Sequence, residues 1–182
     1  MRLVMLGGTG AGKGSQTARI CDRFNITSIS MGDILRNNIA SKTDLGTQAR
    51  AYVEAGELVP DNLMIQLIQQ RLAQPNVSDG WILEGYPRTA FQAEELDFLL
   101  GKMKQKLDWA IYLKVSEEVM TQRALNRGLE GDVVEVVRRR IQNFLESTIP
   151  LLEYYAYAQR LLTIDGEKSL DNVEREIMSS LA

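Results

Sequence analysis

The chain has 182 residues, 45% of them hydrophobic and 25% charged, and its 21 basic and 24 acidic side chains leave a net charge of −3. This is the length of about one globular domain with ordinary composition, and it lacks the basic excess of a nucleic-acid-binding domain. The absence of histidine excludes Ser-His-Asp triads and histidine-ligated metals, and the single cysteine, Cys21, excludes an internal disulfide. No apolar run reaches the roughly 18 residues that cross a membrane, and the stretch before Gly7 is too short for a secretion signal. We therefore expect a cytoplasmic monomer without nucleic-acid or membrane partners.

Short apolar segments alternate along the chain with segments of helical periodicity. Residues 3–6 form an apolar run that predicts a buried strand, and a helix is predicted over 13–24. Further strands are predicted at 26–29, 81–83, 110–113 and 161–164. Further helices are predicted at 31–40, 44–55, 63–72, 89–100, 116–127, 132–160 and 170–180. Pro150 is expected to kink or split the helix over 132–160.

The alternation of strands and helices predicts the fold class. Strands that are apolar throughout and separated by helices are typical of a parallel sheet covered on both faces. We therefore predict an α/β protein in three layers, with a five-stranded parallel sheet between helices. No linker rich in Gly, Ser or Pro divides the chain, so residues 1–182 should form one domain. Residues 30–60 are rich in helix without a strong strand, which predicts a small helical insertion.

A glycine-rich loop, GGTGAGKGS at residues 7–15, connects the first predicted strand to the first predicted helix. Glycines let the backbone wrap a phosphate chain closely, and the amides at a helix N-terminus point at the anion. Lys13 adds a positive charge toward the outer phosphates, and Ser15 is placed to bind Mg²⁺ although Gly14 separates it from the lysine. The loop predicts a P-loop fold and a nucleoside triphosphate site formed by Gly8, Gly10, Ala11, Gly12, Lys13, Gly14 and Ser15.

Residues 7–16 resemble the nucleoside monophosphate kinases, which share Gly-Lys-Gly followed by Thr or Ser and then Gln. The segments SMGDILR at 30–36, GELVPD at 56–61 and EGYPRT at 84–89 are similar to the AMP-binding segments of adenylate kinases and occur in the same order. The resemblance implies a kinase core at 1–29, 61–127 and 132–182, an AMP-binding insertion at about 30–60 and a minimal lid at about 128–131. It also implies reversible phosphoryl transfer from Mg-ATP to AMP, which gives two ADP.

The resemblance also assigns roles to individual residues. Arginine suits phosphate because its planar fork donates two parallel hydrogen bonds. Five basic residues would surround the transferred phosphoryl group: Lys13, Arg88, Arg123, Arg127 and Arg140. Arg123, Arg127 and Gly166 would complete the ATP site, and Mg²⁺ would be held by Ser15 and, through water, by Glu84. The AMP site would comprise Met31, Arg36, Leu58, Val59, Gly85, Arg88, Gln92 and Arg140.

Some of these residues also fit simpler structural roles. The stretches 89–92 and 30–33 both have the form of a helix capping box, so Gln92 could serve the start of a helix instead of pairing with the adenine edge. Asp132 precedes a predicted helix and could cap it, with Glu135 as its partner.

The chain departs from the adenylate kinase pattern in ways that keep other functions open. Thr9 stands where proline is common, Met31 where threonine is common near the AMP base, and Glu84 where aspartate is usual. Leu129 and Gly131 replace an arginine and an aspartate of short lids. A kinase of UMP or CMP and a nucleotide-binding protein with little catalysis are therefore the alternatives. None of these kinase readings needs histidine, because the attacking phosphate oxygen of the monophosphate is already largely ionised near pH 7.

Overall fold

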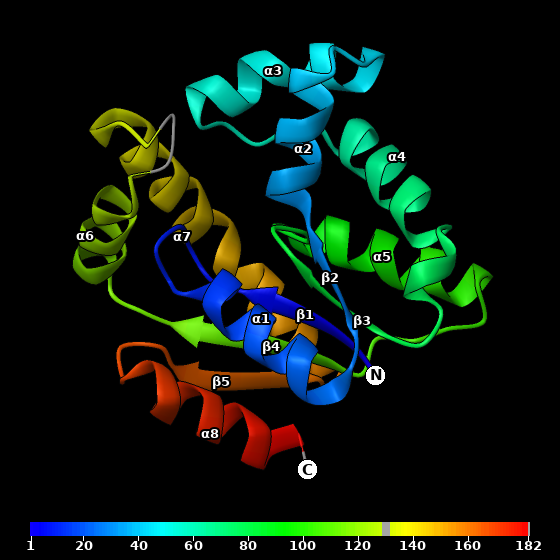
Figure 1. The fold of residues 1–182 in the computed structure, drawn as a ribbon, viewed down its shortest axis with the longest axis vertical. Helices are drawn as coiled ribbons and strands as arrows, with labels where there is room; N and C mark the ends of the chain where they lie inside the picture. Colours follow the sequence, from blue (N-terminus) through cyan, green and yellow to red (C-terminus); the bar gives the residue numbers. More distant parts are fainter. Residues whose placement is uncertain (129–131, 182) are drawn as a thin grey trace.

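The computed structural model describes residues 1–128 and 132–181. Within these residues five strands form one sheet (Figure 1): β1 (Arg2–Leu6), β2 (Thr27–Ser30), β3 (Trp81–Glu84), β4 (Trp109–Lys114) and β5 (Leu161–Asp165). All neighbouring strands are parallel, in the order β2-β3-β1-β4-β5, so the predicted sheet is confirmed. β1 lies at the centre, where the strand order reverses, and parallel sheets bind ligands outside the carboxyl ends of the strands at such a point.

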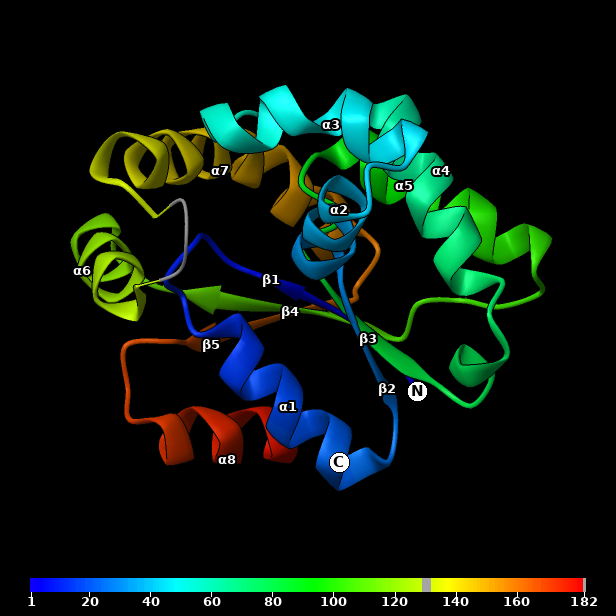
Figure 2. The ribbon, with the colours of Figure 1, turned by 45° about the horizontal axis from the view of Figure 1, so that its top comes forward.

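Helices cover both faces of this sheet (Figure 2). On one face α1 (Lys13–Phe24) packs against α8 (Leu170–Leu181), and on the other lie α4 (Asp61–Leu72), α5 (Ala90–Lys102) and α7 (Val134–Tyr157). The remaining helical elements are α6 (Glu117–Arg127), which packs against α7, the insertion helices α2 (Met31–Ala40) and α3 (Asp44–Ala55), and a short 3-10 turn, η1 (Pro75–Val77). None of the described helices is long and apolar enough to cross a membrane.

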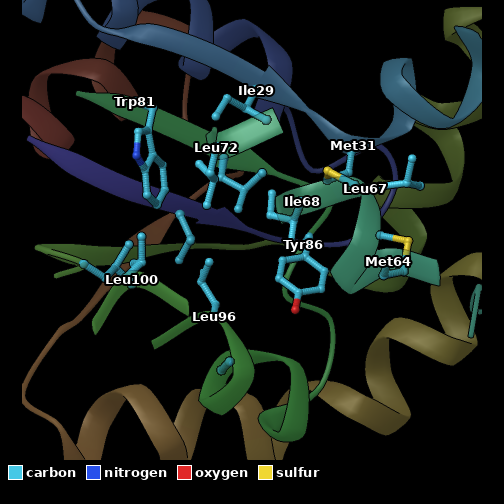
Figure 3. Packing of buried hydrophobic residues seen from close by; sticks show 14 of the residues in the cluster. Ile29, Met31, Met64, Leu67, Ile68, Leu72, Trp81, Tyr86, Leu96 and Leu100 are labelled. Carbon is cyan, nitrogen blue, oxygen red and sulfur yellow. The ribbon is translucent and has the colours of Figure 1, made fainter. Parts of the chain in front are cut away.

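The central strand shows why the strands are apolar throughout. Leu3 and Met5 belong to the apolar cluster beneath α1 and α8, whereas Val4 and Leu6 belong to the cluster beneath α4 and α5. Successive side chains of a strand point to opposite faces, and here both faces are covered, so all four side chains are buried. Figure 3 shows the cluster to which Val4 and Leu6 belong. In it the apolar side chains of α4, among them Ile68 and Leu72, pack in the same core as Trp81 of β3.

Local capping signals fix the insertion helices. Ser30 Oγ accepts a hydrogen bond from Asp33 N at 3.2 Å at the start of α2, and Thr43 Oγ1 accepts one from Gly46 N at 3.0 Å at the start of α3. Helix α3 ends at Gly56, whose φ of +73° is the left-handed conformation that glycine adopts without strain. The cap at Ser30 is therefore confirmed, whereas the Asp33 side chain pairs with Arg36 and does not complete the predicted capping box.

Helix α7 differs from its predicted form. It runs without interruption from Val134 to Tyr157 with Pro150 inside it, so of the two predicted effects of Pro150, a kink or a split, the split is wrong. Proline removes one main-chain donor, but the buried side chains of Leu151 and Tyr155 hold the following turns against the core. The helix also begins at Val134 and ends at Tyr157, inside the predicted bounds of 132–160.

Candidate active site

A cleft of about 610 Å³, open to solvent, lies at the carboxyl ends of β1 and β3. The glycine loop, the segment after β3, the end of the insertion and the middle of α7 form its walls. Six residues that the resemblance assigns to ATP or AMP line it: Gly8, Lys13, Leu58, Gly85, Arg88 and Arg140. The fold thus brings predicted donor and acceptor residues to one cavity.

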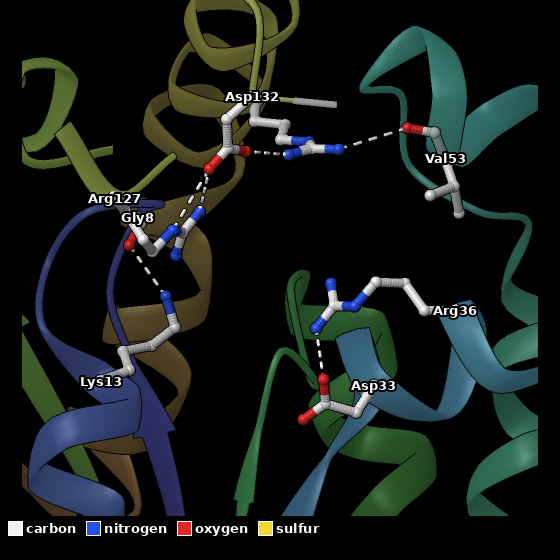
Figure 4. Close-up of polar contacts among 8 residues, drawn as sticks. Gly8, Lys13, Asp33, Arg36, Val53, Arg127 and Asp132 are labelled. Carbon is white, nitrogen blue, oxygen red and sulfur yellow. Dashed lines mark hydrogen bonds and ion pairs between the residues drawn. The ribbon is translucent and has the colours of Figure 1, made fainter. Parts of the chain in front are cut away.

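The glycine loop is shaped by its own backbone. Gly10 and Gly12 have φ values of +83° and +92°, and a Cβ on Gly10 would lie 2.0 Å from the carbonyl oxygen of Met120. Lys13 Nζ donates to the carbonyl oxygens of Gly7 and Gly8, each at 2.8 Å. Figure 4 shows the contact with Gly8. The loop therefore folds back on the lysine and holds its ammonium group in the lining of the cleft.

The Lys13 ammonium lies in surroundings that favour an anion. Burial lowers the pKa of Lys13 from 10.5 to about 8; Glu84 counteracts this, and the positive charges of Arg88 and Arg127 lower the pKa further. An anionic group placed among these cations would raise the pKa again, because opposite charge favours the protonated amine. The electrostatics of the cleft therefore suit a phosphate chain.

Asp132 joins two of the predicted phosphate-binding arginines (Figure 4). Its side chain is only 2% exposed. One carboxylate oxygen accepts from Arg127 Nε and Nη2 at 3.2 and 2.7 Å, and the other accepts from Arg140 Nη1 at 2.9 Å. Arg140 Nη2 also donates to the carbonyl oxygen of Val53 in the insertion, at 3.4 Å.

This arrangement corrects the capping hypothesis for Asp132. The N-cap residue of α7 is Val133, which makes no side-chain capping bond, and Glu135 lies in the exposed first turn. Two guanidinium groups bind the carboxylate more strongly than a main-chain amide does, since ionised donors make the stronger hydrogen bonds. Asp132 is therefore a bridge between α6 and α7.

The two arginines predicted for the AMP phosphate have different partners. Arg36 forms an ion pair with Asp33, and this pair lowers the pKa of the Asp33 carboxyl (Figure 4). Arg88 Nε donates to the carbonyl oxygen of Gly85 at 3.0 Å. Loss of water around Arg88 lowers its guanidinium pKa, and the nearby charge of Arg140 lowers it further. A bound phosphate would relieve the repulsion between Arg88 and Arg140, whereas at Arg36 a phosphate must compete with the Asp33 carboxylate.

Gln92 is buried, does not line the cleft, and is already hydrogen-bonded. Its main-chain N–H donates to Thr89 Oγ1 at 3.2 Å, which confirms the predicted cap of α5. The side chain does not complete the capping box, because Oε1 accepts from Arg88 N at 2.7 Å and Nε2 donates to Asp61 Oδ1 at 2.7 Å. The other predicted base-side residues, Met31 and Val59, are also buried and do not line the cleft.

A second hollow, of about 540 Å³, lies between α1, the end of β4 and the start of α8. Five residues predicted for ATP line it: Ala11, Gly12, Ser15, Arg123 and Gly166. Arg123 Nη1 donates to the carbonyl oxygen of Gly166 at 2.9 Å, so this arginine also holds the loop after β5. The hollow places the predicted nucleoside-binding residues beside the phosphate-binding loop.

The predicted Mg²⁺ residues occupy suitable places. Ser15 is exposed in the first turn of α1, and Glu84 at the end of β3 accepts from Thr17 Oγ1 at 3.4 Å. A Cβ added to Gly14 would lie 3.9 Å from Glu84 Oε2, so the carboxylate faces the start of α1. Both residues offer the hard oxygen ligands that Mg²⁺ prefers. The described residues contain no cluster of three or more His, Cys, Asp or Glu side chains that could hold a metal ion by themselves.

The sequence did not reveal the contacts that several residues of the site make. Gln16, 1% exposed, lines the second hollow and donates to the carbonyl oxygen of Leu170 at 2.9 Å. Asp61 reaches Gln92 across the fold, and Phe144 and Ser147 of α7 line the first cleft. Their roles depend on contacts between distant segments, which spacing along one helix does not reveal.

Comparison with known proteins decides the family. A family model described as adenylate kinase matches residues 5–160. The chain belongs to the adenylate kinase family. Adenylate kinase 2 of Nostoc sp. is 54% identical over 181 residues, which span 100% of this chain and 98% of the relative. Adenylate kinase 2 of Synechocystis sp. is also 54% identical, over the whole of both chains, and the adenylate kinase of Stenotrophomonas maltophilia is 40% identical over 100% of this chain and 99% of its own.

Family membership confirms the predicted P-loop kinase fold and the enzyme class of nucleoside monophosphate kinase. The departures from the adenylate kinase lid, Leu129 and Gly131, lie outside the described residues. Asp132, which follows them, is described and contacts two arginines that flank the lid segment. One carboxylate therefore joins Arg127 at the end of α6 to Arg140 of α7.

Proposed function

We propose that this adenylate kinase transfers the terminal phosphoryl group of Mg-ATP to AMP, reversibly, to give two ADP. The observation that carries the proposal is the convergence of Lys13, Arg88 and Arg140 on one cleft between the glycine loop and the insertion. Family membership supports the same reaction. Kinases of UMP or CMP are not favoured, since the relatives that match this chain over its whole length are named adenylate kinases.

The reaction needs positioning and charge stabilisation rather than a general base. The attacking group is a phosphate oxygen of AMP, which is largely ionised near neutral pH. Negative charge spreads over the transferred phosphoryl group, and the loop amides, Lys13 and the arginines stabilise it. We assign Arg88, Arg123, Arg127 and Arg140 to this task together with Lys13.

On the donor side, we assign the ATP phosphates to the loop at Gly8, Gly10, Ala11, Gly12, Lys13, Gly14 and Ser15. The ATP base would occupy the second hollow beside Arg123 and Gly166, with Arg127 directed at the phosphates. Ser15 and, through water, Glu84 would hold Mg²⁺, which when bound neutralises charge on the outer phosphates.

On the acceptor side, Arg36 and Arg88 would bind the AMP phosphate, with Arg140 shared between the two nucleotides. Met31, Leu58, Val59, Gly85 and Gln92 would surround the base. Since Met31, Val59 and Gln92 are buried in this conformation, AMP entry requires the insertion at about 30–60 to move away from the core. Closure of the insertion and of the lid at about 128–131 would then exclude water and prevent ATP hydrolysis.

All assigned residues come from one chain, which supports action as a monomer, and the nucleotide substrates support a cytoplasmic location. The core would comprise 1–29, 61–127 and 132–182.

A coupled assay tests the proposed reaction. ADP formation is measured at saturating Mg-ATP with AMP, UMP, CMP and GMP in turn, and AMP is expected to give the highest kcat/KM. Equal rates with UMP or CMP would contradict the assignment of the acceptor. Nucleotide binding without turnover of any monophosphate would instead identify a protein that binds nucleotides with little catalysis.

A further inference from the structure

Gln92 is held at both its backbone and its side chain. Its main-chain carbonyl oxygen accepts from the Tyr86 hydroxyl at 3.2 Å, and its main-chain N–H donates to Thr89 Oγ1. Its side-chain oxygen accepts from Arg88 N and its side-chain nitrogen donates to Asp61 Oδ1, each at 2.7 Å. With only 2% of the residue exposed, these contacts leave the carboxamide little freedom.

The two side-chain partners permit one orientation of the carboxamide. A carboxylate only accepts hydrogen bonds and a main-chain amide only donates them. Rotation of the carboxamide by half a turn would place its oxygen against Asp61 and its NH₂ group against the N–H of Arg88. Both contacts would then be lost and four polar groups left mismatched, which is costly for a buried side chain.

The fixed orientation has a consequence for base recognition. After these two contacts the carboxamide keeps one N–H and one oxygen lone pair. Adenine presents a 6-amino donor beside a ring-nitrogen acceptor, which an amide in a set orientation can pair with through both groups. Hypoxanthine presents a 6-oxo acceptor beside an N–H donor, and this reversed pattern requires the rotated carboxamide.

We propose that Asp61 is a positioning residue that selects 6-aminopurine monophosphates by fixing the orientation of the Gln92 carboxamide. The inference rests on the proposed function, in which AMP is the acceptor. Asp61 acts through Gln92 and does not itself touch the base. The main-chain N–H of Arg88 supplies the other half of the constraint, and side-chain substitution does not remove it.

Asp61 is also the first residue of α4, where a carboxylate stabilises the helix through its dipole. Asp44 occupies the corresponding first position of α3, so Asp44→Asn makes the same change of charge and shape at another helix start. This matched variant separates a general effect on helix stability from an effect on Gln92.

The experiment measures kcat/KM for AMP and for inosine monophosphate at saturating Mg-ATP, with dissociation constants of both from calorimetry. Asp61→Asn should lower the ratio of kcat/KM for AMP to kcat/KM for inosine monophosphate about tenfold or more. The reason is that an asparagine at position 61 can rotate to pair with either orientation of the Gln92 carboxamide. Asp44→Asn should leave the ratio unchanged. In a Gln92→Ala background, Asp61→Asn should have no further effect on the ratio. Thermal unfolding establishes that each variant is folded, and Asp61→Ser, whose hydroxyl also donates and accepts, replaces Asp61→Asn where it is not.

Three results would overturn the role of Asp61: an unchanged ratio, an equal loss for both monophosphates, or an effect of Asp61→Asn that persists without Gln92. Failure of the proposed function gives a different result, because the parent enzyme would then not phosphorylate AMP at all. The two failures are therefore distinguished by the parent enzyme alone.

Discussion

The glycine loop and the arginine cluster around Asp132 both prepare the cleft for phosphate, but they do so by different means. The loop depends on backbone conformation, with positive φ at Gly10 and Gly12 and with Lys13 bonded to its own loop carbonyls. The cluster depends on side chains, with Asp132 bridging Arg127 and Arg140 from two helices.

The difference shows which parts of the site must change when substrate binds. We expect the loop to accept phosphate with its backbone unmoved, because Gly10 and Gly12 already have the positive φ of its turns, although the Lys13 ammonium must leave its loop carbonyls to reach a phosphate. Arg36 is paired with Asp33, and Arg140 touches Asp132 and the insertion, so these arginines must exchange or share partners. We therefore expect the loop backbone to be preformed, whereas the basic side chains of both sites exchange or share partners when the nucleotides bind.

The largest expected effect comes from the loop. Lys13→Met should lower kcat by about 10²–10³-fold, the scale for removal of one donor to the transition-state charge. The fold should survive, because the ammonium contacts loop carbonyls and not the apolar core. Turnover and melting temperature are measured beside Lys102→Met, a change at the ammonium that lies over the Phe98 ring. Near-parental turnover of Lys13→Met would refute the assignment of the loop.

The arginine cluster should give the next largest effect. Asp132→Asn keeps the shape of the side chain but removes the negative charge between the guanidinium groups of Arg127 and Arg140. The two arginines should then no longer be held in place, and kcat should fall about 10- to 100-fold. KM for AMP should change less than kcat if Asp132 acts by placing arginines on the transferred group. Asp171→Asn, which removes an exposed ion pair with Arg19, is the control. A drop in KM alone, or no change, would contradict a positioning role.

The base side should affect preference more than rate. Gln92→Ala should erode the preference for AMP over UMP and CMP by about 1–3 kcal/mol, the value of one two-point contact with a base. KM for ATP should stay at the parental value, because Gln92 lies on the acceptor side. Rates with all three monophosphates test this, and an unaltered preference would show that Gln92 serves only the start of α5.

The smallest expected effect is a change in bound protons. Since the pKa of Lys13 is lowered to about 8, the amine is about half protonated at pH 8 in the free enzyme, and bound phosphates should raise that pKa. Binding of ATP at pH 8 should therefore take up about half a proton, and the uptake should fade toward pH 6.5, where the amine is already charged. Calorimetry in buffers of different ionisation enthalpy measures it. Uptake that persists in Lys13→Met would assign the proton to another group.

Much of this protein could be predicted from the sequence because its signals are local. The glycine loop and the caps at Ser30 and Thr89 depend on neighbouring residues, and the alternation of apolar strands with helices depends on burial of both faces of a sheet. The same locality explains the error at Pro150: the rule for proline in a helix is local, whereas the packing that carries α7 past it is not.

Only the tertiary structure decided what the charged and polar side chains of the site contact. Asp132 had the sequence of a helix cap, yet the fold places two guanidinium groups within its reach, and ionised donors outcompete a main-chain amide. Gln92 lies in a sequence typical of a capping box, yet its side-chain amide donates a hydrogen bond to Asp61, which is distant in the chain. Spacing along the chain determines which residues share a helix face, but a hydrogen-bond partner from another element is set by how the elements pack.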